Sequence, residues 1–141
     1  PGDVIDFDCI RRDIQNLGDV YNIQEIAIDR WNAAQITTQL AGDGFEMISF
    51  GQGYASMSSP TKELEKLIYS KELNHGGNPV LRWMMGNCAT ETDAAGNIKV
   101  SKKRSLEKID GIVALIMALG RLAVTGEPVK SVYSDDGIQF I

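Results

Sequence analysis

The sequence predicts an α/β domain in which parallel strands are flanked by helices and a β-hairpin precedes the last long helix. Three observations predict this class. Helix-like and strand-like apolar patterns alternate over residues 7–50, a glycine-containing turn separates two strand-like runs at residues 88–101, and a very apolar helix follows. With 141 residues and 43% hydrophobic content, one domain with its own core is the default.

The first half of the chain alternates between helix and strand. Apolar residues recur at helical spacing over residues 7–17, and Gly18 is expected to end that helix. Residues 23–29 form an isoleucine-rich run with an acid at its carboxyl end, which is typical of a buried strand. Residues 32–40 then predict a helix and residues 45–50 a second strand. This order favours parallel strands joined by a helix.

The second half contains two helix start signals and a turn signal. Ser59-Pro60 predicts a helix that begins with serine as its cap and proline in its first turn. Asn78-Pro79 repeats the signal for a short helix through Met85. Runs at residues 88–92 and 97–101 flank a glycine-containing loop, which predicts a β-hairpin.

The last helix carries a single acid, Asp110, followed directly by a glycine. Asp110 is the only charge between Ile109 and Leu119, and helical spacing places it on one face with Val113 and Met117. An ionised carboxylate packed into a core is costly unless it is paired or bound to a metal, so a divalent cation is one explanation. The alternative is an ordinary acid in the first turn of a helix, where the helix dipole favours it.

A second acid, Asp29, stands at the carboxyl end of the predicted strand, where ligands bind in open α/β sheets. The alternative is that Asp29 caps the next helix. Asp29 and Asp110 together would suit magnesium, which prefers hard oxygen ligands. Two such ions about 4 Å apart can activate water and stabilise the leaving oxygen in phosphodiester cleavage. A site of this kind usually needs a third carboxylate.

Four basic residues near the start of the last helix are candidates for binding phosphates: Lys99, Lys102, Lys103 and Arg104. The alternative is a solvated hairpin edge whose charges discourage pairing with other strands. His75, in a glycine-rich loop, is a candidate for assisting catalysis. The alternative is a loop histidine whose side chain hydrogen-bonds the backbone.

Composition and motifs exclude several classes of protein. The net charge of −5 argues against nucleic-acid binding through bulk charge, but it permits a local basic patch over an acidic metal site. Cys9, Cys88 and His75 are too far apart for a zinc motif, and nothing suggests a disulfide scaffold, so a reducing cytosolic setting is expected. There is no P-loop motif, and the longest apolar run, residues 111–120, is about half a membrane span.

Several motifs occur in a specific order and cover nearly the whole chain. They are AIDRWNA at 27–33, GQG at 51–53, MSSPTKELE at 57–65, LNHGGNPVLRW at 73–83, Asn87, GNIK at 96–99 and KIDGIVALIMAL at 108–119. Together they resemble the C-terminal nuclease domain of the large terminase subunit of tailed phages and prophages. By motif, Asp29 matches that family's acid after the central strand, and Asp110 matches its acid on the last helix.

The resemblance implies an RNase H-like fold, present here in part, and a metal-dependent endonuclease that cuts concatemeric DNA during packaging. Asp29 and Asp110 are then catalytic residues that help to hold two Mg²⁺ or Mn²⁺ ions. The hairpin corresponds to a family elaboration near the DNA-binding groove. The implied partners are double-stranded DNA, the portal, the small terminase subunit and the ATPase domain of the same polypeptide. The implied location is the cytoplasm of the bacterial host, with no membrane association.

Two departures from the family pattern set expectations for activity. The family's first acid lies on the first strand of the fold, upstream of this chain, and the first three strands of the sheet are missing as well. We therefore expect an N-terminally truncated domain over residues 1–126, with an incomplete metal site and a loosely held tail at 127–141. Such a piece should cut DNA weakly or not at all, and without the ATPase domain it should not package DNA.

The truncated sheet also affects assembly. Residues 23–29 would expose a strand edge, which invites pairing with another copy and predicts a dimer or larger assembly. The alternative to an enzyme is a non-catalytic docking module that contacts the portal or the small terminase subunit, with its acids serving only structure.

Overall fold

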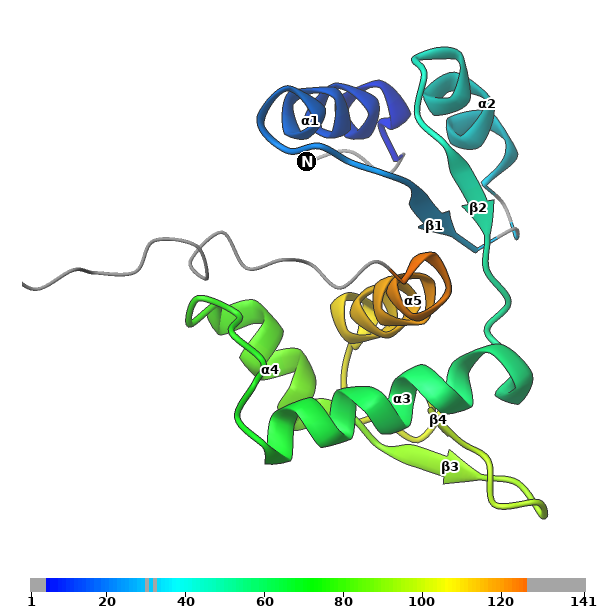
Figure 1. Ribbon diagram of the computed structural model, residues 1–141, viewed down its shortest axis with the longest axis vertical. Coiled ribbons are helices and arrows are strands. Elements are labelled where there is room, and N and C mark those ends of the chain that lie inside the picture. The colour runs from blue at the N-terminus through cyan, green and yellow to red at the C-terminus, as the bar shows by residue number, and fades with distance from the viewer. Residues whose placement is uncertain (1–4, 30, 32, 127–141) are drawn as a thin grey trace, which may run out of the picture.

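The computed structural model, which describes residues 5–29, 31 and 33–126, has helices on both sides of a small parallel sheet and a separate hairpin (Figure 1). In chain order the elements are α1 (Phe7–Val20), β1 (Ile26–Ile28), α2 (Ala34–Gly42), β2 (Met47–Ser49), α3 (Tyr54–Tyr69), α4 (Pro79–Asn87), β3 (Thr90–Thr92), β4 (Ile98–Val100) and α5 (Asp110–Thr125). The predicted tail at 127–141 lies outside the described residues. The α/β class is confirmed.

The strands β1 and β2 pair in parallel, with Ile26 opposite Met47 and Ile28 opposite Ser49. The helix α2 connects them, because two parallel strands need a crossover between their opposite ends. Within the described residues no strand pairs with the outer edge of β1, since the sheet order is β1-β2. The predicted parallel arrangement is confirmed, although both strands are shorter than their apolar runs.

The helix α1 packs against α2 and does not end at Gly18, as predicted, but continues to Val20. A side chain at position 18 would place its Cβ only 2.9 Å from Cζ of Phe45. The glycine therefore permits a close approach between α1 and the segment before β2, and does not act as a stop signal. Arg11 strengthens the same contact by donating from Nε to Oδ2 of Asp43 at 2.6 Å.

The hydrophobic core is centred on α5, which lies between the sheet and α3 (Figure 1). Ile112 and Ile116 of α5 are almost completely buried, and Met57 and Leu64 of α3 pack against the same cluster. Ala27 of β1 contacts this cluster from the sheet side. Burial of apolar surface on both sides of α5 therefore joins the sheet to α3.

The helix α3 begins at Tyr54, five residues before the predicted start at Ser59-Pro60. Its first turn closes on the carbonyl of Gly53, which accepts from the Met57 N–H at 3.0 Å. Pro60 lies inside the helix and is buried, and its Cγ would be 3.3 Å from a Cβ at Gly120. Close packing of α3 on α5 thus accommodates a proline that, from sequence alone, favoured a helix start.

Two local predictions are confirmed by hydrogen bonds. Asn78 caps α4, because its side chain accepts from the backbone N–H groups of Val80 and Leu81, both at 3.0 Å. The strands β3 and β4 form the predicted antiparallel hairpin, with Glu91 opposite Lys99. Within the described residues, no helix combines the length and the apolar character needed to span a membrane.

The core position of α5 leads to a stability prediction. Ile116→Ala should lower the free energy of unfolding by about 2–5 kcal/mol, because the fully buried side chain leaves a cavity behind. Urea denaturation followed by circular dichroism measures the loss. Val124→Ala, at a position of the same helix that is 70% exposed, is the control and should change stability by no more than about 0.5 kcal/mol. Equal losses in the two variants would contradict the central role of α5.

An ion pair between Glu25, the residue before β1, and Arg121 of α5 predicts how stability depends on pH. Arg121 Nε donates to Glu25 Oε1 at 2.6 Å, and this hydrogen bond lowers the pKa of Glu25 below its ordinary value. A lowered folded-state pKa contributes stability that is present above the ordinary pKa and is lost as pH falls through the lowered one. The melting temperature should therefore fall between about pH 5 and about pH 3. Glu25→Gln should melt lower at neutral pH and show a shallower fall; an unchanged slope would contradict this origin.

Candidate functional site

Asp110 is the first residue of α5, and its side chain is 61% exposed. The preceding residue, Ile109, is buried in the core, and Val113 is buried one turn later. The expectation that Asp110 packs into the core is therefore wrong: the apolar stripe continues along the helix, but Asp110 stands where the helix emerges at the surface. This position agrees with the alternative, an acid favoured in a first turn by the helix dipole.

Asp110 is paired with Lys102, whose Nζ donates to its Oδ1 at 2.6 Å. This hydrogen bond lowers the pKa of Asp110, and partial burial opposes the shift. The carboxylate is therefore ionised at neutral pH and can act as an oxygen ligand. Lys103 and Arg104, the residues after Lys102, are exposed on the same loop between β4 and α5.

The fourth predicted basic residue, Lys99, is held on the hairpin. Its Nζ lies 3.2 Å from Oε1 of Glu91 and 5.0 Å from the centre of the Tyr54 ring. Hydrogen bonds from Ser101 and Lys99 lower the pKa of Glu91. Lys99 is thus fixed by an acid on the neighbouring strand and by an aromatic ring on α3.

A cavity of about 330 Å³ brings these groups together between the start of α3, the hairpin and the first turns of α5. Its lining comprises Gln52, Met57, Glu91, Lys99, Val100, Ser101, Lys102, Lys103 and Val113. The structure thus gathers three of the four predicted basic residues and adds Glu91, an acid in the first strand-like run of the predicted hairpin. In the hairpin Glu91 lies opposite Lys99, and this cross-strand pairing is the signal that could have indicated the acid.

Asp29 lies one residue beyond β1 and is half-buried. Its Oδ1 accepts from the backbone N–H of Trp31 at 3.3 Å. It does not cap α2, because that helix begins after Ala33 with no side-chain cap. The alternative role as a helix cap is therefore excluded, and Asp29 shapes the turn that follows β1.

The parallel sheet relates Asp29 to the cavity beside Asp110. Gln52, a few residues beyond the carboxyl end of β2, lines this cavity together with Lys102. Because β1 and β2 are parallel, Asp29 follows β1 at the same edge of the sheet. Among the described residues, however, no three histidine, cysteine or acidic side chains form a group that could hold a metal ion.

His75 lies in a different place, in a cavity of about 320 Å³ between the end of α3, α4 and α5. Leu67, Leu81 and Ile112 are among its neighbours there. Its Nδ1 is buried and has no hydrogen-bond partner among the described residues. The expectation that this side chain bonds to backbone is therefore not met at Nδ1, and the structure does not bring His75 together with Asp110.

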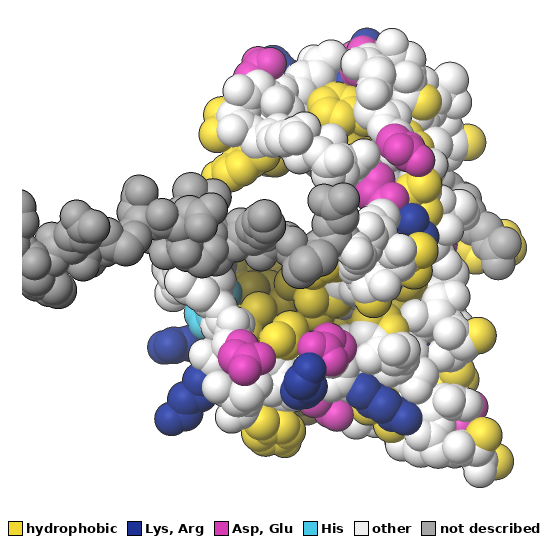
Figure 2. Space-filling model, in the orientation of Figure 1, with side chains coloured by type: hydrophobic (Ala, Val, Ile, Leu, Met, Phe, Trp, Pro, Cys, Tyr) yellow, Lys and Arg dark blue, Asp and Glu magenta, His cyan; other side chains and the backbone are white. Residues whose placement is uncertain are grey.

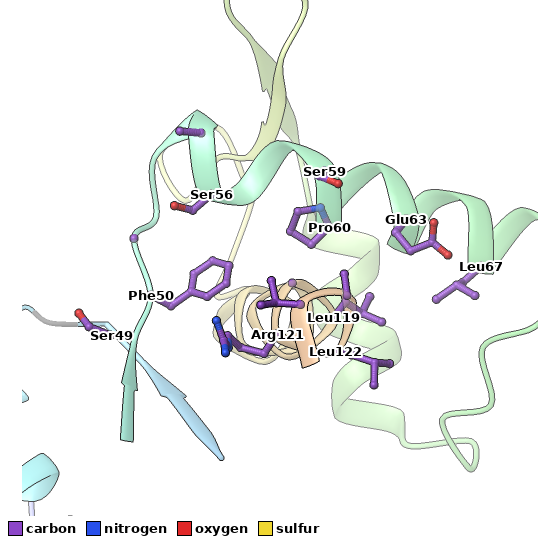
Figure 3. Close-up of a pocket in the computed structure, with 15 residues that line it drawn as sticks. Ser49, Phe50, Ser56, Ser59, Pro60, Glu63, Leu67, Leu119, Arg121 and Leu122 are labelled. Carbon is purple, nitrogen blue, oxygen red and sulfur yellow. The ribbon is translucent and has the colours of Figure 1, made fainter. Parts of the chain in front are cut away.

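A cavity of about 680 Å³ lies at the other end of α5, where the helix passes α3 (Figure 3). Phe50, Pro60 and Leu119 form part of its apolar lining, and Glu63 and Arg121 are its charged members. It is larger than the cavity beside Asp110 but is lined by residues 119–124 of α5, about two and a half turns or more from that acid. The larger cavity is therefore not the one beside Asp110, and size alone does not identify the candidate site.

A carboxylate at a helix start, beside a lysine-lined cavity at the carboxyl edge of a parallel sheet, is an arrangement suited to an α/β nuclease domain. The chain belongs to the family described as terminase large subunit, endonuclease domain, whose model matches residues 2–127. The α/β fold and the similarity to phage proteins agree with this membership.

The chain is similar to curated proteins of a bacterium and of a phage. It is 34% identical over 122 residues to Protein YmfN of Escherichia coli (strain K12), covering 85% of this chain and 27% of that protein. It is 33% identical over 129 residues to the large terminase subunit of Enterobacteria phage HK97, covering 90% of this chain and 25% of that protein. The chain thus spans about a quarter of the length of these relatives.

A solved structure gives the same result at the level of the fold. The crystal structure of the HK97 bacteriophage large terminase superimposes with a TM-score of 0.78 at 32% sequence identity, covering 86% of this chain and 26% of that one. The α/β arrangement of helices and small sheets is therefore that of part of a large terminase.

The exposure of Asp110 predicts that it contributes little to folding. Asp110→Asn should change the free energy of unfolding by less than about 1 kcal/mol in urea denaturation, because exposed ion pairs are weak. Asp43→Asn is the matched comparison and should lose more, since this carboxylate is 12% exposed and bonded by Arg11. If the two losses are equal, Asp110 has a structural role, contrary to this reasoning.

Proposed function

We propose that this chain is part of an RNase H-like endonuclease that cleaves DNA during viral genome packaging. The observation that carries the proposal is the ionised Asp110 beside a lysine-lined cavity, at the sheet edge that Asp29 follows, in a member of the terminase endonuclease family. Asp29 and Asp110 are the proposed catalytic residues. Lys99, Lys102, Lys103 and Arg104 are the proposed DNA-binding residues.

The donor chemistry fits a divalent metal such as Mg²⁺ or Mn²⁺. Asp29 and Asp110 offer carboxylate oxygens, and the lowered pKa of Asp110 keeps its oxygens available. Two bound ions would activate a water molecule and stabilise the leaving oxygen of a phosphodiester. The lysines would position the phosphate and offset the local negative charge.

The described residues supply fewer ligands than a two-ion site needs, since they contain no suitable group of three. We therefore propose that a further carboxylate comes from outside them, and that residues 1–141 alone cleave DNA weakly or not at all. The relatives are about four times longer than their match to this chain, so full activity belongs to a longer polypeptide.

The proposed setting follows from the family. Double-stranded DNA would be the substrate, and the portal, the small terminase subunit and an ATPase domain of the same polypeptide would be the protein partners. The proposed location is the cytoplasm of the bacterial host. All of these belong to the proposal and rest on family membership.

One observation favours the second candidate function, a docking module without catalysis. The outer edge of β1 has no strand partner among the described residues, and α1 has no buried residue although Ile10 and Leu17 repeat at helical spacing. The portal, the small terminase subunit or a second copy of this chain could bind the surface formed by the open edge of β1 and the apolar residues of α1. Docking through α1 and β1 is compatible with catalysis at Asp110, which lies elsewhere.

Loss of a metal ligand provides the central test. In a polypeptide extended upstream through the whole family domain, Asp29→Asn and Asp110→Asn should each lower Mn²⁺-dependent plasmid cleavage more than about 100-fold, since even outer-shell changes at metal sites cost 10–100-fold. Mn²⁺ should also raise the melting temperature of the unsubstituted protein but not of either variant. Asp43→Asn is the control for a general loss of fold. Cleavage that survives Asp110→Asn would exclude Asp110 as a catalytic residue, whereas absence of cleavage by the unsubstituted extended polypeptide would favour the docking module.

The ion pair with Lys102 makes a separate prediction. Because the ammonium group of Lys102 occupies Oδ1 of Asp110, Lys102→Met should free this oxygen and tighten Mn²⁺ binding by roughly 1.5- to 5-fold, the strength of an exposed pair. Isothermal titration calorimetry on the extended polypeptide measures the change. Lys103→Met removes the same charge from the same cavity and should leave Mn²⁺ affinity nearly unchanged. Weaker Mn²⁺ binding in Lys102→Met would contradict the competition.

A further inference from the structure

A second groove, of about 550 Å³, lies along α3 where the turn of the hairpin meets the helix. Tyr54, Ser58, Ser59, Lys62, Lys66 and Asn97 line most of it. It shares no lining residue with the cavity beside Asp110, but the two are adjacent, because Lys99 of that cavity lies 5.0 Å from the ring centre of Tyr54. We call this surface the α3 groove.

The α3 groove is held in shape by contacts between the hairpin and the helix. Ser58 is buried, and its Oγ accepts from the backbone N–H of Ile98 at 3.2 Å. Lys62 Nζ donates to the carbonyl of Gly96 at 3.5 Å. These bonds fix the hairpin on α3, so that the groove does not depend on an induced movement of either element.

One acid, Glu63, also lines the α3 groove, where it pairs with Lys66 at 3.0 Å, so the groove carries two lysines and one acid. Asp93 accepts from the N–H of Asn97 at 2.8 Å and also from its side-chain amide at 2.8 Å, which lowers the pKa of Asp93. Lys62 and Lys66 are exposed, and Figure 2 shows Lys and Arg side chains interspersed with acidic ones over α3. The groove therefore presents ammonium groups outward.

The other groups in the groove suit a phosphate backbone. Tyr54 forms an uncharged wall of the groove: burial and then the charge of Glu91 raise the pKa of its phenol, which also hydrogen-bonds with Glu91. Ser59 adds a hydroxyl, and the Asn97 amide, which donates one N–H to Asp93, has a second N–H; both groups are common phosphate donors. From Ser58 to Lys66 the helix extends about 12 Å, which matches three to four nucleotides at about 3.4 Å per nucleotide along one strand.

We propose that duplex DNA held at the Asp110 cavity continues along the α3 groove, where Lys62 and Lys66 contact backbone phosphates. This inference rests on the proposed nuclease function and names a binding surface beyond the predicted basic run. Lys99 over Tyr54 forms the junction between the two surfaces. Because lysine, hydroxyl and amide groups here meet phosphates and not base edges, the contact is independent of DNA sequence.

The test is the salt dependence of duplex binding by the 141-residue chain. Fluorescence anisotropy of a labelled 20-base-pair duplex, in EDTA, is measured between about 50 and 200 mM NaCl. A plot of log K against log salt has a negative slope, and each phosphate contact contributes about 0.9 to its magnitude. Lys62→Gln combined with Lys66→Gln should therefore make the slope shallower by about 2. The control, Arg12→Gln with Arg82→Gln, removes two exposed cations from α1 and α4 and should keep the wild-type slope.

The outcomes separate this inference from the metal site. An unchanged slope in the Lys62/Lys66 variant overturns the α3 groove and leaves the nuclease proposal standing, because the Mn²⁺ response of the extended polypeptide tests Asp29 and Asp110 independently. Equal losses in both double variants also overturn it, as they indicate bulk charge. Absence of duplex binding by the wild-type chain at 50 mM NaCl overturns it as well. If polyglutamate loses as much affinity as the duplex, the groove binds acidic chains in general and its assignment to DNA fails.

Discussion

The burial of α5 against two partners at once is the constraint on which the rest of the structure depends. Ile112 and Ile116 are almost completely buried, because the sheet covers α5 on one side and α3 covers it on the other. The hairpin is bonded to α3 through Ser58 and so takes its position from α5 indirectly. Asp110 is placed by the same packing, because Ile109 buries the chain immediately before the helix begins.

The electrostatics of the site follow from this placement at the surface. Asp110 and Lys102 are each more than half exposed, and an ion pair in such a setting is weak because water screens both charges. A carboxylate in such a weak pair remains ionised, and its partner can be exchanged at little cost in free energy. In the proposed function a divalent cation would displace the lysine, and the displaced ammonium group would then be available to contact a phosphate. Arg121 and Glu25, which are more buried, are suited to a structural role instead.

Features determined by local sequence were predictable, and features determined by distant contacts were not. The Asn78 cap and the hairpin register depend on residues a few positions apart. Gly18 and Pro60 were misinterpreted as helix boundaries because their roles depend on Phe45 and Gly120, which lie far along the chain. The residue pattern singled out Asp29 and Asp110, and the resemblance to a family matched both to its acids. The exposure of Asp110 and the adjoining α3 groove, in contrast, depend on how α3, the hairpin and α5 pack together in space.

The open edge of β1 lies between the proposed metal ligand Asp29 and α1, a helix with no buried residue. A strand added beside β1 would satisfy the backbone N–H and C=O groups of this edge and could also cover apolar side chains such as Ile10 and Leu17. If that strand ran parallel to β1, its carboxyl end would lie at the same sheet edge as Asp29. An acid there would join Asp29 beside the cavity that Lys102 lines. One added strand would thus serve the open edge, the exposed face of α1 and the proposed metal site, whereas the basic surfaces of the hairpin and α3 are formed by the described residues alone.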